Sequence, residues 1–308
     1  MIADHVFDVI VIGGGLAGVN CALECFDIRL DTLLVESTPA LGGQLPEVLH
    51  SVRNVAAGRF ASGADLQRAL HETAAILRDR VRLSDPVTAV DLEARWIEAS
   101  GDRLRFRALV VAAGTSEQYL AAAPDGAFGG DITYQLENDP RHFIGSEAAV
   151  IGGGDSAALD ALALAADGAT VTLVYRSHTL TARDDVIAQI RAESRITELP
   201  GWELVATKGE RRLEGLKLAQ RETGEERTLV VKGLVVKIGR LPNTGFLGGQ
   251  LELDHAHAIV VDRDLQTSHS GVFAAGDIVS DAYPRAAAAL GQGSLAARSV
   301  LRYLQGRR

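Results

Sequence analysis

The stretch 8–36 constrains the fold more than any other part of the chain, because it combines a strand pattern, a glycine turn, a helix and a second strand. Val9 to Ile12 is a short apolar run, as expected of a strand buried on both faces. Three glycines then follow in Gly-x-Gly-x-x-Gly spacing: Gly13, Gly15 and Gly18. A second buried strand, Leu33 to Val35, ends at Glu36, which is placed to hydrogen-bond an adenosine ribose. The stretch therefore predicts a dinucleotide site.

The glycine spacing has a physical cause at each position. Gly13 permits the tight turn, Gly15 lets the backbone approach a pyrophosphate, and Gly18 lets the helix pack close to the strand. The helix that follows offers free N–H groups at its first residues, Leu16 and Ala17, together with a partial positive charge. We therefore expect the phosphates of the dinucleotide at this helix start.

The same unit recurs in the middle of the chain. Ala149 to Ile151 is predicted to be a strand, 158–166 a helix, and Val171 to Val174 the closing strand. The turn between the first strand and the helix has Gly-x-Gly-x-x-Ala spacing and contains these candidate ligands: Gly152, Gly154, Asp155, Ser156 and Ala157. The repeat predicts a second dinucleotide site.

The two copies differ at the end of their second strand. The first copy ends in a carboxylate at Glu36, whereas the second has Tyr175 and Arg176 in the matching place. A cation there suits the 2′-phosphate of NADP better than a bare 2′-hydroxyl. A solvated surface arginine is the alternative interpretation of Arg176. Different endings imply two different dinucleotides.

The C-terminal third is predicted to return to the first domain. It contains a strand and turn over 235–243, a buried strand over 271–277 that ends in Asp277, and a helix over 285–300. We therefore expect an α/β protein of two Rossmann-like domains, with the second inserted into the first. The predicted bounds are 1–114 with 239–308 for the first domain, and 115–238 for the second. Within the first domain, an amphipathic helix is expected over 64–78.

Composition narrows the class of protein. A length of 308 residues suits two domains, and a net charge of −9 disfavours a nucleic-acid binder. No apolar run reaches the roughly 18–20 residues of a membrane span, and the N-terminus lacks the regions of a signal peptide, so a cytoplasmic location is expected. The two cysteines, Cys21 and Cys25, are expected to be buried helix residues. No metal-ligand set stands out among the eight histidines.

Taken in order, these motifs resemble the thioredoxin-reductase-like branch of the flavoprotein disulphide reductase superfamily, over nearly the whole chain. The resemblance implies FAD at the first site, a homodimer, and NADP(H) at the second site. The residues it implies for FAD are Gly13, Gly15, Leu16, Ala17, Gly18, Glu36, Gly43, Gln44, Ala113, Gly114, Asp277, Arg285 and Ala286. Of these, Asp277 would bind the ribityl chain, and the helix that starts at Arg285 would point at the pyrimidine end of the flavin. The residues it implies for NADP(H) are Gly152, Gly154, Asp155, Ser156, Ala157 and Arg176.

The chain departs from that branch where thioredoxin reductases carry Cys-x-x-Cys after a tyrosine. Here Gln135 and Asn138 follow Tyr134 in those places. A dithiol relay needs a thiolate nucleophile and a resolving thiol, so an ordinary thioredoxin reductase is not expected. The segment is similar to the ferredoxin/flavodoxin–NADP reductases that also lack the cysteines. Asp139 is a candidate proton donor beside the flavin, and a purely structural role in an Asp-Pro turn explains it equally well.

Three functional interpretations remain open from the sequence. The first is an FAD-dependent NADPH oxidoreductase that reduces ferredoxin, flavodoxin or a similar small carrier. The second is an enzyme that reduces a small disulphide or a quinone directly at the flavin. The third is a flavoprotein with a degenerate second site, which two departures favour. The segment 51–55 lacks an aromatic residue to stack on the flavin, and Arg183 is the only arginine that follows Arg176 closely.

Overall fold

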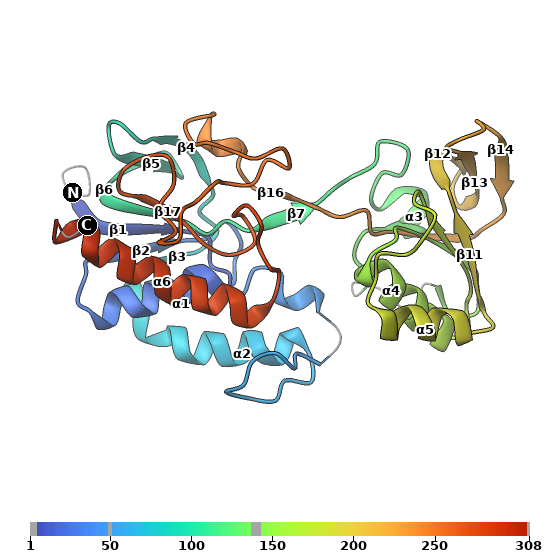
Figure 1. The fold of residues 1–308 in the computed structure, drawn as a ribbon, viewed down its shortest axis with the longest axis horizontal. Helices are drawn as coiled ribbons and strands as arrows, with labels where there is room; N and C mark the ends of the chain where they lie inside the picture. Colours follow the sequence, from blue (N-terminus) through green and yellow to red (C-terminus); the bar gives the residue numbers. More distant parts are fainter. Residues whose placement is uncertain (1–4, 49–50, 137–142, 307–308) are drawn as a thin grey trace. The chain divides into compact units, whose positions relative to one another are not determined.

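The computed structural model describes residues 5–48, 51–136 and 143–306. The chain divides into two compact units: unit 1 comprises 1–116 and 241–308, and unit 2 comprises 117–240 (Figure 1). Each break lies two residues after the predicted one. The two segments that cross between the units, β7 (Thr115–Glu117) and β16 (Arg240–Pro242), pair with each other as a two-stranded sheet.

Unit 1 is built on one mixed sheet. Its strands are β1 (Val6–Ile12), β2 (Thr32–Val35), β3 (Val81–Arg82), β4 (Val87–Asp91), β5 (Trp96–Ala99), β6 (Asp102–Val111) and β17 (Val272–Ala274). Its helices are α1 (Leu16–Asp27), α2 (Gly63–Ala74) and α6 (Ala286–Leu304), with 3₁₀ turns η1 (Leu45–Glu47), η2 (Ala75–Arg80) and η5 (Gly245–Leu247).

The order of the sheet in unit 1 is β3-β2-β1-β6-β5-β4, with β17 also paired to β6. Strands β1, β2, β3, β6 and β17 run parallel, while β5 is antiparallel to both β4 and β6. Strand β6 has three partners, because β1 lies along one edge, while on the other edge its first half pairs with β5 and its second half, from Leu109, pairs with β17. The parallel strands therefore end together at one edge of the sheet.

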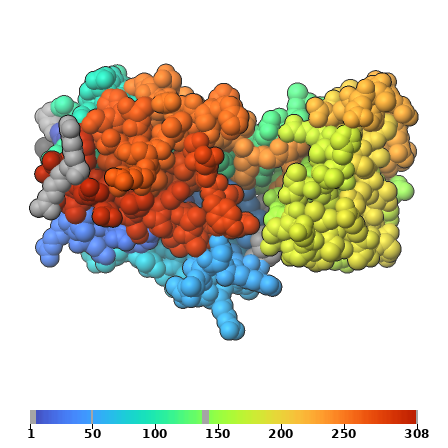
Figure 2. Space-filling view, viewed as in Figure 1, coloured from blue at the N-terminus to red at the C-terminus, as the bar shows by residue number. Residues whose placement is uncertain are grey.

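Two buried cores hold this sheet. Helices α1, α2 and α6 pack on one face (Figure 1), and the core on the other face combines residues of β4 and β5, which belong to the same sheet, with Leu247, Ile259 and Ile278. Helices α1 and α6 pack so closely that a Cβ on Gly293 would lie 2.4 Å from the carbonyl oxygen of Ala17. Figure 2 shows the segment from residue 241 onwards, orange to red, on the surface of unit 1, so the chain returns to its first domain as predicted.

The helix predicted over 64–78 is wrong at its C-terminal end. The α-helix begins after Ser62, whose side chain accepts a hydrogen bond from the Asp65 N–H, and it ends at Ala74. A 3₁₀ segment over 75–80 follows, and Arg78 within it has a φ of 47°, which is not a helical conformation. Leu77 stays buried, so the apolar periodicity continued past the end of the α-helix.

Unit 2 repeats the architecture on a smaller scale. Its parallel sheet has the order β11-β10-β9-β15-β8. These strands are β8 (Ile132–Thr133), β9 (Glu147–Ile151), β10 (Thr170–Tyr175), β11 (Ile196–Pro200) and β15 (Gly233–Val236). The helices are α3 (Ala127–Gly130), α4 (Asp155–Ala166) and α5 (Asp184–Ala192), and an antiparallel sheet is formed by β12 (Trp202–Gly209), β13 (Leu213–Gln220) and β14 (Glu226–Leu229).

Strands β9 and β15 are neighbours in space although α4, β10 and β11 come between them in sequence. The strand order therefore reverses beside β9, and this is the position at which open α/β sheets bind ligands. Across the described residues, no helix is both long enough and apolar enough to cross a membrane. The predicted fold, two Rossmann-like halves with the second inserted into the first, is confirmed.

Candidate functional site

The first glycine turn lies at the carboxyl end of β1, in unit 1. Gly13 has a φ of +106°, and its N–H donates to the carbonyl of Val35 at 2.8 Å, which joins the ends of β1 and β2. A Cβ on Gly18 would lie 1.9 Å from the carbonyl oxygen of Gly13. Only glycine therefore allows α1 to start this close to the turn.

The start of α1 is open to a ligand. Its N-cap is Gly15, which makes no side-chain capping bond, and the first turn contains no acidic residue. A Cβ on Gly15 would meet no protein atom within 4 Å. The N–H groups at the start of α1 are therefore not capped by a side chain, and a helix N-terminus with uncapped N–H groups is the arrangement that fits a diphosphate.

Glu36 is buried beside this turn and is held by backbone donors. Its Oε2 accepts the N–H of Gly14 at 2.6 Å, and its Oε1 accepts the N–H of Thr38 at 2.7 Å. The side chain of Ser37 also donates to Oε1, at 3.2 Å. An ionised carboxylate has about four lone-pair sites, so capacity remains for a ribose hydroxyl. The sequence analysis did not predict that Glu36 also stabilises the glycine turn through its hydrogen bond with the N–H of Gly14.

The predicted loop residues Gly43 and Gln44 lie against the same turn. A Cβ on Gly43 would come 3.2 Å from the Cα of Gly15, so the two backbone segments almost touch. The side-chain amide of Gln44 donates to Thr115 Oγ1 at 3.0 Å and to Asp277 Oδ2 at 3.4 Å. Four segments that are remote in sequence therefore meet at one site.

Ala113 and Gly114 follow β6 and are held by a residue that the sequence analysis missed. The Asn243 side chain donates to the Ala113 carbonyl at 2.8 Å, and its backbone N–H donates to the Gly114 carbonyl at 3.0 Å. Ser116 in turn donates to the Asn243 side chain at 2.7 Å. The sequence contains a signal for this residue, because Asn243 follows a proline at a predicted turn, but no function was predicted for that turn.

The last predicted residues of the first site lie at the start of α6. Arg285 is its N-cap, without a side-chain capping bond, so the N–H of Ala286 is free of a capping side chain. The guanidinium of Arg285 lies 5.2 Å from the ring centroid of Tyr283. A second missed residue, Gln292, accepts the N–H of Gly276 at 2.6 Å and so anchors α6 to the turn that carries Asp277.

The second glycine turn, in unit 2, has the same form at the end of β9. Gly152 has a φ of +145°, and a Cβ there would lie 2.0 Å from the Lys237 carbonyl oxygen. Helix α4 starts at its N-cap Gly154 without a side-chain capping bond. The third motif position is Ala157, which is fully buried. A second open helix start is therefore available to a phosphate group.

The charged residues around this second turn have different roles. Asp155 is held by Arg183, whose Nε lies 3.0 Å from Oδ2 and whose backbone N–H donates to Oδ1 at 2.7 Å. Arg183 is therefore committed to an ion pair. Arg176 is exposed and has no hydrogen-bond or ion-pair partner within the described ranges. Ser156 is exposed at the start of α4.

A partly buried ionic cluster beside this turn was not predicted. The Lys237 Nζ donates to the Tyr134 carbonyl and lies 3.7 Å from Glu117 and 3.9 Å from Asp160. Arg240 contacts the same Glu117 carboxylate at 2.8 Å. The only signal in the sequence was a lysine at the end of an apolar strand. Among the residues the structure describes, no group of three or more His, Cys, Asp or Glu side chains could hold a metal ion.

The thiols lie in the core of unit 1. Cys21 and Cys25 are both free, fully buried, and on α1, as predicted. A hydrogen bond with Cys25, followed by burial, raises the pKa of Cys21 well above its ordinary value, so this thiol stays protonated. Gln135 lies just after β8, and its backbone N–H donates a hydrogen bond to Thr133 Oγ1 at 3.0 Å. Asn138 and the candidate proton donor Asp139 lie outside the described residues.

Comparisons with known proteins agree with this geometry. The family model described as "Pyridine nucleotide-disulphide oxidoreductase" matches residues 7–293. The chain is 33% identical to the bifunctional thioredoxin reductase/thioredoxin of Mycobacterium leprae, over 98% of this chain and 66% of that protein. It is 32% identical to the thioredoxin reductase of Mycolicibacterium smegmatis, over 97% of both chains. Among solved structures, the thioredoxin reductase of T. acidophilum superposes with a TM-score of 0.87 at 25% identity, covering 98% of this chain and 99% of that one.

Proposed function

Because the chain belongs to the pyridine nucleotide-disulphide oxidoreductase family, we propose that it is an NADPH oxidoreductase that passes electrons from its flavin directly to ferredoxin, flavodoxin or a similar small carrier. FAD and NADP are the cofactors of this family and of its thioredoxin-reductase-like members. The observation that carries the proposal is the combination of two intact glycine turns with the absence of Cys-x-x-Cys after Tyr134 in the sequence.

The residues of unit 1 fit FAD along its whole length. The open start of α1 at Gly15 suits the diphosphate, and Glu36 has acceptor capacity for the adenosine ribose. Asp277, positioned by Gln44, suits the ribityl hydroxyls, and the free N–H groups at the start of α6 suit the pyrimidine end of the ring. When bound, FAD supplies the hydride chemistry, while these residues supply orientation and a fixed electrostatic environment.

The residues of unit 2 fit a phosphorylated dinucleotide. The start of α4 at Gly154 suits the diphosphate, and Arg176 is a free cation at the end of β10. Because Arg183 is engaged by Asp155, we assign the 2′-phosphate contact to Arg176 alone. This assignment predicts a preference for NADPH that depends on one guanidinium.

The kind of electron acceptor is inferred from where the thiols lie. In the relatives named thioredoxin reductase, the name states the substrate, but this chain has glutamine and asparagine at positions 135 and 138. Its only thiols, Cys21 and Cys25, are buried in α1, and Cys21 is held protonated. A flavin without a dithiol relay must reduce its acceptor directly. We also propose that the protein is a homodimer, which sedimentation velocity tests.

One observation favours a second candidate. With Arg183 paired to Asp155, Arg176 is the single free arginine among the residues assigned to the second site that the structure describes, so the chain is alternatively a flavoprotein without NADPH-dependent turnover. Anaerobic titration separates the two, because NADPH bleaches the flavin absorbance only if the second site works. Cytochrome c reduction that depends on added ferredoxin then supports the proposed carrier. Turnover with a quinone or a small disulphide but not with ferredoxin or flavodoxin would contradict it.

A further inference from the structure

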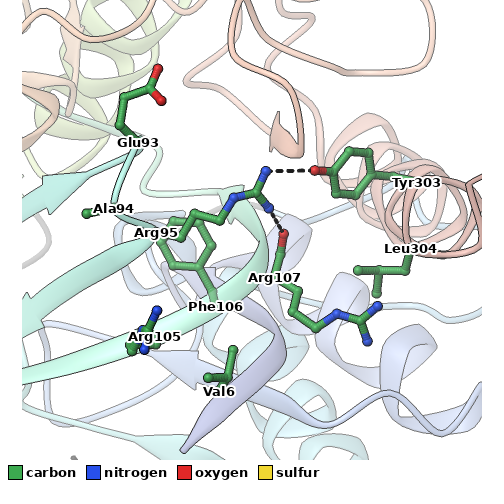
Figure 3. A pocket seen from close by; sticks show the side chains of 9 residues that line it. All are labelled: Val6, Glu93, Ala94, Arg95, Arg105, Phe106, Arg107, Tyr303 and Leu304. Atoms are coloured by element: carbon green, nitrogen blue, oxygen red, sulfur yellow. Dashed lines mark hydrogen bonds between the residues drawn. The ribbon is translucent and has the colours of Figure 1, made fainter. Parts of the chain in front are cut away.

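A hollow of about 550 Å³ lies in unit 1 at the end of β1 opposite the glycine turn (Figure 3). It is bounded by Val6 at the start of β1, by the turn between β4 and β5, by the first half of β6 and by the end of α6. Three of its lining residues are arginines: Arg95, Arg105 and Arg107. No residue assigned to either nucleotide site lines it, so it is a separate feature of unit 1.

Arg95 is held in place inside the hollow. One guanidinium nitrogen donates to the Arg107 carbonyl at 2.6 Å and another to the Tyr303 hydroxyl at 2.9 Å (Figure 3). The guanidinium carbon lies 6.0 Å from the Tyr303 ring centroid. These hydrogen bonds engage both terminal nitrogens of the guanidinium and fix the orientation of its plane. A fixed cation loses little conformational entropy when it binds an anion.

The positive charge of the hollow is not balanced by the acids around it. Arg107 forms an ion pair with Asp8 at 2.7 Å, but Arg105 has no ion-pair or hydrogen-bond partner in the part of the chain that the structure describes. Glu93, the acid on the rim, is 94% exposed and lies 3.5 Å from His269 instead. A protein of net charge −9 therefore presents a locally cationic hollow.

We propose that this hollow binds a small polyvalent oxyanion, either a phosphorylated or a polycarboxylate metabolite. The guanidinium fork matches the oxygen spacing of both phosphate and carboxylate groups. Arg105 and Arg95 provide the cationic contacts, and the apolar side chains of Val6, Phe106 and Leu304 line the remainder. The volume lies within the usual range for small-molecule pockets. This inference goes beyond the proposed electron transfer and does not rest on it.

The test is isothermal titration of the FAD-loaded protein with inorganic pyrophosphate and, separately, with citrate at low ionic strength. We expect saturable binding of at least one, and the stronger of the two identifies phosphate or carboxylate as the preferred group. Arg105→Gln should weaken that binding by about tenfold or more, since one charge-assisted contact is lost. Arg105 is exposed, so the fold should be unaffected. Neither nucleotide site contains Arg105, so a loss on this substitution assigns the binding to the hollow.

Arg103→Gln is the matched control. Arg103 lies on the same outward row of β6, two residues away, but its guanidinium carbon stacks 4.4 Å from the Trp96 ring centroid and does not line the hollow. It should change binding by less than about twofold, as screened surface charges do. If Arg105→Gln and Arg103→Gln weaken anion binding equally, the binding depends on the overall surface charge and not on the hollow, and the proposal is overturned. Failure of both probes to bind, or a changed oligomeric state of Arg105→Gln without anion binding, would overturn it too.

Discussion

Gly15→Val separates the role of the glycine turn in ligand binding from its role in the fold. Gly15 has a φ of −72° and a ψ of −175°, which any residue adopts, and a Cβ there would meet no protein atom within 4 Å. The variant should therefore fold. The cost of an apolar β-branched residue at a helix N-cap is about 1 kcal/mol, which lowers the melting temperature by about 2–4 °C.

The effect on FAD should be far larger. A valine side chain would occupy the space in front of Leu16 and Ala17, and so would keep the diphosphate from their N–H groups. Two lost hydrogen bonds to a charged group cost together about 3 kcal/mol or more. This corresponds to at least about a hundredfold weaker binding. The purified variant should be colourless, and added FAD should bind it with a raised dissociation constant in a flavin fluorescence titration.

Gly154→Val is the matched control in the second turn. Gly154 is also an N-cap in extended backbone, and the nearest atom to its Cβ position is Thr181 Oγ1 at 4.0 Å. This variant should stay yellow with full FAD stoichiometry but lose bleaching by NADPH. If Gly15→Val retains normal flavin content, or if both variants lose FAD equally, the assignment of the two turns to two ligands is wrong.

Three further predictions concern Arg176, the two thiols and Glu36. Arg176→Ala should raise the Michaelis constant for NADPH at least about tenfold and leave that for NADH unchanged, because one charge-assisted contact to the 2′-phosphate is lost. Arg227 is an exposed arginine of β14, and Arg227→Ala should change neither Michaelis constant. Cys21→Ala with Cys25→Ala should leave turnover with an artificial one-electron acceptor unchanged. Because the hydrogen bond with Cys25 and burial raise the pKa of Cys21, the unmodified protein should lose stability above about pH 9, and the variant should lose less, as measured by urea denaturation at several pH values. Glu36→Gln should weaken FAD binding and lower stability by about 1–3 kcal/mol, because an amide NH₂ would face a backbone N–H, and a variant with unchanged flavin content and unfolding midpoint would refute this.

The sequence was informative wherever one local pattern determines the structure. The apolar runs at 9–12 and 149–151 became the central strands β1 and β9, because a glycine turn and a helix follow each of them. The predicted end of the helix at residue 78 was wrong, because the periodicity of apolar residues does not show where the backbone leaves the helical conformation. Leu77 keeps the apolar spacing, but Arg78 has a left-handed φ, and the α-helix has already ended at Ala74.

Contacts between distant segments were beyond sequence reasoning. Asn243 lies 130 residues from Ala113, and Lys237 lies 103 residues from the Tyr134 carbonyl that it contacts. Each residue alone resembles an ordinary turn or strand-end residue. Their roles arise because parallel strands end at a common edge, which places the following residues side by side.

The two glycine turns differ at both ends, and these differences support different ligands. The third motif position must be glycine in the first turn, since a Cβ on Gly18 would collide with Gly13, whereas the second turn accommodates Ala157. At the strand end, Glu36 is matched by Tyr175, which donates to Glu198 at 2.6 Å. Burial first, then this hydrogen bond, raises the pKa of Tyr175, so a neutral phenol stands where the first site has a carboxylate. A 2′-phosphate meets no negative charge from Tyr175, and the next residue, Arg176, is a free cation. Discrimination between NADPH and NADH should therefore depend on that single side chain.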